Sequence, residues 1–194
     1  MDHAPSTMLG RTASLLSVLL PLACAPSPVP SPPAAAPPPA PKASAAAQGD
    51  SGAAAAFARL GALVGDWEAT TAKGTTIRES YRLVSNDSAL VQTYTTPSGK
   101  ETLTIFHLDG TRVVATHYCA QKNQPRLALR AGPDDRRFQF VFFDATNLSD
   151  PGASHLVKLG VALVDADHFE ETEIYEEAGK EDVTVLAFRR AKQR

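Results

Sequence analysis

The chain has 194 residues and nearly balanced charge, with 19 Lys and Arg against 21 Asp and Glu. That balance disfavours nucleic acid as a partner, because phosphate binding needs a clustered basic face. Nine of the 15 prolines lie between residues 26 and 41. This uneven distribution predicts a leader of about 50 residues followed by one domain, which is large enough for a single core.

The leader begins with an export signal. An apolar stretch at 13–23 follows Arg11, and it is much shorter than the roughly 20 residues of a membrane-spanning helix, so it is typical of a secretion signal. The first residues are acidic rather than basic, unlike the start of a signal peptide, so we expect translation to begin at Met8, with Met1 as the alternative. The segment ends in Leu22-Ala23-Cys24, which resembles the lipobox of bacterial lipoproteins.

The lipobox resemblance implies that residues 1–24 are a signal peptide, that Cys24 is acylated, and that the protein is anchored to the outer membrane facing the periplasm. Pro21 and Leu22 depart from the usual lipobox pattern. Ordinary cleavage after Ala23 or Ala25 is the alternative and would leave a periplasmic or secreted protein.

Residues 25–56 consist mainly of Ala, Pro, Ser and Gly. Such a segment buries too little apolar surface to order itself, so we expect a disordered linker whose proline-rich part is extended. The globular domain is then expected at 57–194.

The domain is predicted to be all-β after one short helical segment. Phe57, Leu60, Leu63 and Val64 have helical spacing, and from there the apolar pattern has a period of two. Strands are expected at 67–73, 75–84, 88–96, 101–108, 111–120, 126–131, 137–143, 155–164, 168–176 and 182–190. Tight turns join them, so ten sequential antiparallel strands should close into an up-and-down barrel that leaves no open edge.

Gly65-Asp66-Trp67, at the start of the first strand, resembles the Gly-x-Trp motif of the calycins, which include lipocalins and fatty-acid-binding proteins. The resemblance implies a barrel that binds a small molecule, with an arginine near its end packed across Trp67. Arg190 is the matching position. Ten strands suit the fatty-acid-binding or nitrobindin-like architecture better than the eight-stranded lipocalin barrel. The phrases at 88–91, 107–110, 116–119, 123–126 and 144–147 resemble bacterial secreted lipocalin-like proteins, and this resemblance implies no reaction.

The hairpin around Asp109-Gly110 identifies candidate ligand-binding residues. If Leu108 pairs with Thr111, Thr102 lies opposite His117, and the face that carries Phe106, His117 and Cys119 is uncharged. We expect this face inside the barrel, because an unpaired buried charge is costly. His117 and Cys119 could line the cavity. They could alternatively bind haem or a transition metal with further ligands such as His155 or His168, although no cofactor is required.

Three further candidates complete the predicted site. Phe138, Phe140 and Phe142 alternate on one strand face, as core residues or as the wall of an apolar pocket, and Phe140 is taken as the ligand contact. Asn123 and Asn147 are expected in loops at one mouth of the barrel, where they bind a polar group of the ligand or satisfy loop backbone atoms.

The acidic residues Glu170, Glu171, Glu173, Glu176 and Glu177 are interpreted as a solvated edge. The sequence therefore predicts an exported binding protein for a small apolar or amphipathic molecule. The alternatives are an enzyme with His117 as general base and a structural envelope lipoprotein without a ligand. We expect a small-molecule ligand and the membrane as partners, and no nucleic acid.

Overall fold

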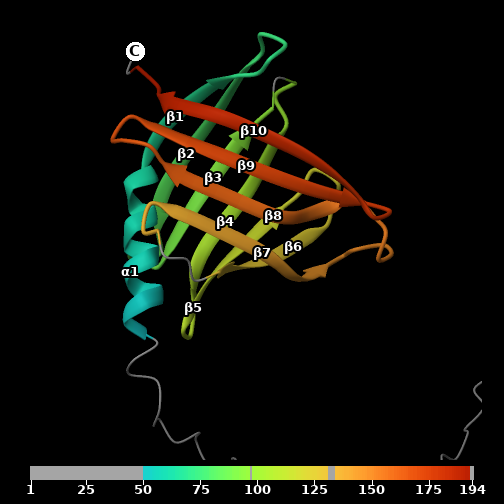
Figure 1. The fold of residues 1–194 in the computed structure, drawn as a ribbon, viewed down its shortest axis with the longest axis horizontal. Coiled ribbons are helices and arrows are strands. Elements are labelled where there is room, and N and C mark those ends of the chain that lie inside the picture. Colours follow the sequence, from blue (N-terminus) through green and yellow to red (C-terminus); the bar gives the residue numbers. More distant parts are fainter. Residues whose placement is uncertain (1–49, 97, 131–133, 193–194) are drawn as a thin grey trace, which may run out of the picture. The chain divides into compact units, whose positions relative to one another are not determined.

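Alternating apolar and polar residues run through ten segments of the chain, and each forms a strand in the computed structural model, which describes residues 50–96, 98–130 and 134–192 (Figure 1). The elements in chain order are α1 (Asp50–Leu60), the 3-10 turn η1 (Gly61–Leu63), β1 (Gly65–Thr70), β2 (Thr76–Val84), β3 (Ala89–Thr95), β4 (Glu101–Asp109), β5 (Arg112–Tyr118), β6 (Gln124–Arg130), β7 (Arg137–Thr146), β8 (His155–Leu163), β9 (His168–Glu177) and β10 (Lys180–Arg190).

The strands form a closed antiparallel barrel in which each strand pairs with the next along the chain. The barrel closes where β1 pairs with β10, with Trp67 opposite Arg190 and Glu68 opposite Arg189. This topology confirms the predicted ten-stranded up-and-down barrel. Closure gives the paired strands no free edge and encloses one face of every strand.

The β4–β5 turn differs from the predicted register by two residues. Asp109 pairs with Arg112 across Gly110 and Thr111, so Thr104, rather than Thr102, lies opposite His117. Gly110 has φ +58°, a conformation that glycine adopts without strain. Because side chains alternate with a period of two, a shift of two leaves the predicted inward face unchanged.

The helix begins earlier than the sequence pattern predicts. Residues 50–56, assigned to the disordered linker, belong to α1, and Ala53 and Ala56 are buried one turn apart. α1 lies against β4 and β5 (Figure 1), so a short alanine run that cannot form a core alone orders itself against the barrel. Residues 1–49, which include the signal peptide, Cys24 and the rest of the linker, lie outside the described residues. None of the described helices is long and apolar enough to cross a membrane.

Trp67 anchors the part of the core next to η1. Its indole Nε1 donates a hydrogen bond to the Leu63 carbonyl at 2.6 Å, and its ring packs edge-on against Phe169, which stacks on Phe188. The Arg190 guanidinium lies 4.3 Å above the Trp67 ring, so the contact expected between these residues is present. Arg190 also donates to the carbonyls of Ala62, Val64 and Ala166.

Candidate functional site

One part of the barrel interior is lined by polar residues. They project inward from β2, β3, β4, β5 and β9, whose backbones place alternate side chains inside the barrel. We call this set the inner polar cluster: Glu79, Tyr81, Gln92, Tyr94, Thr104, His117, Glu171, Glu173 and Tyr175.

Glu171 connects strands that are not neighbours in the sheet. Its side chain extends inward from β9, and its Oε2 accepts hydrogen bonds from the Tyr81 hydroxyl at 3.1 Å and from Gln92 Nε2 at 3.0 Å. Glu171 is 2% exposed. Burial, followed by the nearby charge of Glu79, raises the pKa of Glu171 well above its usual range. The carboxyl group therefore favours its protonated form in the closed interior.

Glu79 is equally buried but has no hydrogen-bond partner. Its side chain is 2% exposed, and neither carboxyl oxygen is paired with any group among the described residues. Burial is the largest influence and raises the pKa of Glu79 to about 7. A buried polar group without a hydrogen bond destabilises the folded protein, and a bound hydrogen-bond donor would recover that free energy.

Glu173 lies two residues beyond Glu171 on the same face of β9 and is half-buried. Burial, and next the charge of Glu171, raises its pKa to about 8. Tyr94 is also half-buried, and its pKa rises to about 12 through burial and then through the charges of Glu173, Glu79 and Glu171. The accessible side of the cluster therefore combines a carboxyl group with a phenol.

His117 uses both of its ring nitrogens. Its Nδ1 lies 3.0 Å from Thr104 Oγ1, and its Nε2 lies 3.1 Å from the Tyr175 hydroxyl. Burial lowers the pKa of His117 to about 4, so the ring is neutral at physiological pH. A neutral imidazole carries one N–H, so it donates to one of the two hydroxyls and accepts from the other.

Tyr175 connects the cluster to solvent. It forms part of the wall of an open cavity of about 440 Å³ at the mouth of the barrel, together with Thr184 and Asp182 of β10 and with Gln121 and Ser154 from two loops. In the sheet, Thr184 lies opposite Glu173 and Asp182 lies opposite Tyr175. Of the inner polar cluster, Tyr175 is the residue that lines the mouth cavity, and Glu173 is the next inward residue of β9 behind it.

Four of the predicted ligand contacts do not line the mouth cavity. Phe106 and Phe140 are fully buried and pack together with ring centroids 5.3 Å apart. Asn147 is exposed and donates to the Lys122 carbonyl. Asn123 is buried near the mouth, where its Nδ2 donates to the Ser154 carbonyl at 2.9 Å and its Oδ1 has no partner among the described residues.

Cys119 lies just beyond β5, near His117. Its Sγ is 3.3 Å from Gln121 Oε1 and 3.9 Å from the Tyr175 hydroxyl. The structure thus brings the predicted pair, His117 and Cys119, together around Tyr175. No group of three or more His, Cys, Asp and Glu side chains within residues 50–96, 98–130 and 134–192 is arranged to hold a metal ion.

The interpretation of the acidic run on β9 as a solvated edge is wrong for two of its residues. Glu171 is buried and Glu173 is half-buried, whereas Glu170 and Glu177 are exposed. The signal was present in the strand pattern, because Glu171 and Glu173 alternate with outward residues and share a face with Phe169 and Tyr175. Glu79 shares a face with Ile77 and Tyr81 in the same way, and it was missed.

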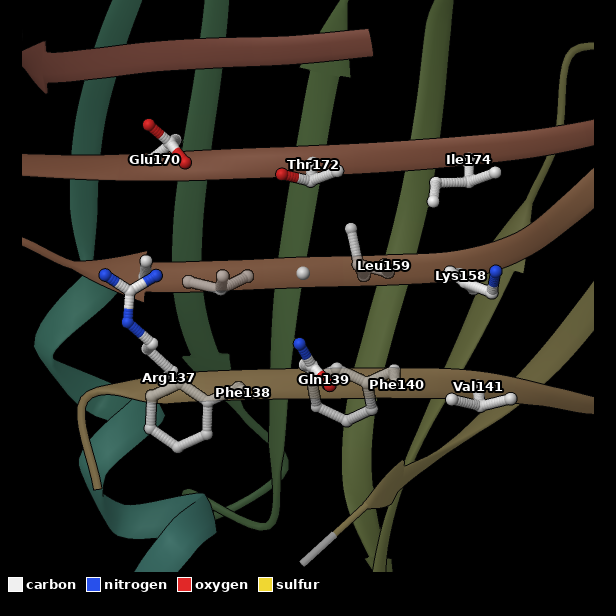
Figure 2. Close-up of a pocket in the computed structure, with 13 residues that line it drawn as sticks. Arg137, Phe138, Gln139, Phe140, Val141, Lys158, Leu159, Glu170, Thr172 and Ile174 are labelled. Carbon is white, nitrogen blue, oxygen red and sulfur yellow. The ribbon is translucent and has the colours of Figure 1, made fainter. Parts of the chain in front are cut away.

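Two other hollows lie away from the inner polar cluster. Figure 2 shows one on β7, β8 and β9, where Lys158, Leu159 and Thr172 are among the lining residues. Its volume is about 200 Å³. The other, of about 350 Å³, lies between α1 and the barrel. Neither has a residue of the inner polar cluster in its lining. A third hollow, of about 160 Å³, includes Glu79 in its lining. The mouth cavity, at about 440 Å³, is larger than these three and is lined by Tyr175, so it is the stronger candidate site.

Comparisons with known proteins give little further information. No protein-family model matches the sequence, and no curated protein shows significant similarity to it. Among solved structures, the crystal structure of Rv2717c from M. tuberculosis is similar, with 14% sequence identity and a TM-score of 0.47 over 71% of this chain and 98% of its own. Function must therefore be inferred from the residues of this barrel.

Proposed function

We propose that this protein is a binding protein that holds a small amphipathic molecule at the polar end of its barrel. The observation that carries the proposal is the connection between the inner polar cluster and solvent. Tyr175 lines the mouth cavity and also contacts His117, so a polar group entering the mouth reaches buried hydrogen-bonding side chains. Ligand-binding pockets are typically concave and present a few polar groups that converge on the ligand.

The filled aromatic part of the interior restricts where the ligand binds. Trp67, Phe106, Phe140, Phe169 and Phe188 are all at most 2% exposed. We therefore assign Phe106 and Phe140 to the core, and we place the polar end of the ligand among the residues around Tyr175. The resemblance to calycins supports a binding role, although those barrels commonly keep more of their interior open for the ligand.

The alternatives have less support. An enzyme with His117 as general base needs a ring nitrogen that faces the substrate, but both nitrogens are engaged by hydroxyls, so Tyr175 would have to relay the proton. A structural lipoprotein without a ligand is compatible with the aromatic core. It does not account for the unpaired carboxyl group of Glu79.

Binding can be measured with the neutral dye N-phenyl-1-naphthylamine and the purified full chain. We expect dye fluorescence to rise on binding and to fall when eight-carbon amphiphiles compete for the site. The substitution Tyr175→Phe should weaken binding of a polar-headed competitor about fivefold, which corresponds to one lost neutral hydrogen bond. Tyr118→Phe is the matched control, because Tyr118 is exposed on the outer face of β5. Absence of binding by the dye and by all competitors would overturn the proposal.

We also propose that the protein is exported and anchored in the bacterial outer membrane through Cys24. The support is the lipobox-like segment ending at Cys24 and the proline-rich stretch that follows it. Labelling cells with a palmitate analogue should mark the protein and should fail for Cys24→Ser. Cys119→Ser, which changes the other cysteine, should label normally. Equal labelling of the Cys24→Ser variant would contradict the anchor.

A further inference from the structure

The inner polar cluster is acidic and has no internal counter-charge. Glu79 and Glu171 are each 2% exposed, and Glu173 is half-buried beside them. No Lys or Arg is buried in the part of the chain that the structure describes, and His117, the histidine in the cluster, is neutral. Three carboxyl groups thus share a low-dielectric interior without a cation from the protein, and ionising them there is costly.

Glu79 adds an observation that is independent of charge. Both of its carboxyl oxygens are inaccessible to solvent, and neither has a hydrogen-bond partner among the described residues. Glu171, by contrast, accepts two hydrogen bonds. Gln92, Glu171 and Tyr81 lie close enough to Glu79 to act on its pKa, but none of them forms a well-aligned hydrogen bond to it. Because buried polar atoms are almost always paired in folded proteins, the carboxyl group of Glu79 can accept a further donor.

The surrounding side chains favour an organic cation over a metal ion. The acidic residues do not form a metal-binding group within the described ranges. Two phenols, Tyr81 and Tyr94, lie next to Glu79 on β2 and β3, with Tyr94 directly opposite Glu79 in the sheet. Aromatic faces and carboxylates together suit an ammonium or guanidinium group, which gains from both cation–π contact and ion pairing.

The mouth cavity gives such a cation a route to the cluster. Glu173 lies between Glu171 and Tyr175 on the inward face of β9, and Thr184 lies opposite it on β10. Tyr175 and Thr184 both line the mouth cavity. Asp182, Glu177 and Glu181 line the mouth cavity together with Lys180. Behind Tyr175, Glu173 is the first carboxyl group of the inner polar cluster, with Glu171 and Glu79 deeper.

We propose that the inner polar cluster binds the cationic head of an amphipathic amine, with Glu173 contacting the ammonium group and Glu79 supplying the second, deeper carboxylate. This inference rests on the proposed binding function and names its ligand class. An ammonium group donates the hydrogen bonds that Glu79 lacks and neutralises charge that no protein side chain balances.

Proton release should accompany binding. In the free barrel the pKa of Glu173 is raised to about 8 and that of Glu79 to about 7, so both groups are largely or partly protonated at neutral pH. A cation next to them lowers both pKa values, and protons leave as it binds. The other titratable groups that face this site are Tyr81, Tyr94, His117, Cys119, Glu171, Tyr175 and Asp182, with Glu177, Lys180 and Glu181 at the mouth.

Calorimetry with three eight-carbon probes tests the ligand class. Octylammonium, octanol and octanoate share a tail and differ in the head group. We expect octylammonium to bind the full chain at least tenfold more tightly than octanol, and octanoate to bind most weakly. Affinity for octylammonium should rise about tenfold or more between pH 6 and pH 8, while affinity for octanol stays constant, because only the cation displaces protons. Titrations in buffers with different ionisation enthalpies should show net proton release.

Isosteric variants locate the site. Glu173→Gln and Glu79→Gln should each weaken octylammonium binding at least tenfold and reduce its pH dependence, and should change octanol binding far less, because glutamine keeps the hydrogen-bonding groups and removes the charge. Glu170→Gln is the control, since Glu170 is exposed on the outward face of the same strand. Melting curves verify folding, and Glu173→Gln keeps the test valid if the buried Glu79 variant fails to fold.

The outcomes separate the two proposals. Equal binding of the three probes, or octylammonium binding that Glu173→Gln leaves unchanged, overturns the amine site while the binding function stands. If no probe binds at any pH, the amine site and the proposed function both fail.

Discussion

Glu79 would link the stability of this barrel to the ligand that we propose. The residue lies in the middle of β2 between Ile77 and Tyr81, and its inward direction follows from strand alternation. Its burial without a partner costs free energy in the empty protein. Strained or unpaired groups of this kind concentrate at functional sites, where a ligand supplies what the fold lacks.

The pKa of Glu79 predicts how stability depends on pH. Its folded-state pKa of about 7 exceeds the ordinary value of 4.5. Below about pH 4.5 both states are protonated, and as pH rises from there through 7 only the unfolded state loses its proton, so stability falls. The substitution Glu79→Gln removes this fall in stability, because glutamine does not ionise. We expect the variant to be about 1–3 kcal/mol more stable than the parent at pH 8 and similar at pH 4.5, measured by urea unfolding.

A matched variant distinguishes this effect from a general change in charge. Glu170→Gln removes a carboxyl group from the exposed side of β9 and should alter stability by less than about 0.5 kcal/mol at either pH. If Glu79→Gln is less stable than the parent at pH 8, Glu79 is stabilised in its ionised form and our interpretation of its environment is incorrect.

At the scale of elements, α1 packs against the barrel, and this packing stabilises the helix. The helix contacts β4 and β5, and Ala53 and Ala56 are buried while Ala54 and Ala55 remain exposed. Alanine has the highest helix propensity, but a helix of 11 residues is marginal alone. Packing against the barrel therefore decides where the domain begins.

Paired substitutions on α1 test this view. Ala56→Asp places a charge in the buried contact and should lower the free energy of unfolding by about 2 kcal/mol or more. Ala55→Asp, one position away on the exposed face, introduces the same residue into the same helix and should cost less than about 1 kcal/mol. Thermal or urea unfolding of both variants measures the difference. Equal effects would show that α1 is not packed as described.

For the whole molecule, closure of the barrel brings together groups that are far apart in the chain. Tyr81 and Glu171 are 90 positions apart and share a hydrogen bond, and His117 and Tyr175 are 58 apart. Sequence alternation places each of these residues inside. Only the circular order of strands, completed by the β1–β10 pair, decides which of them meet.

The sequence by itself determined the ten strands and the inward face of the β4–β5 hairpin, because strand alternation and turn residues are local properties of the chain. The resemblance to the Gly-x-Trp motif placed Arg190 against Trp67. The sequence also indicated His117 and Cys119 as neighbours. The tertiary structure decided that Glu79, Glu171 and Glu173 form one cluster, that Phe106 and Phe140 pack in the core, and that α1 begins at Asp50. Those outcomes depend on burial between distant strands, and this burial raises the pKa of each carboxyl group. The local sequence pattern does not encode which distant strands bury a given residue.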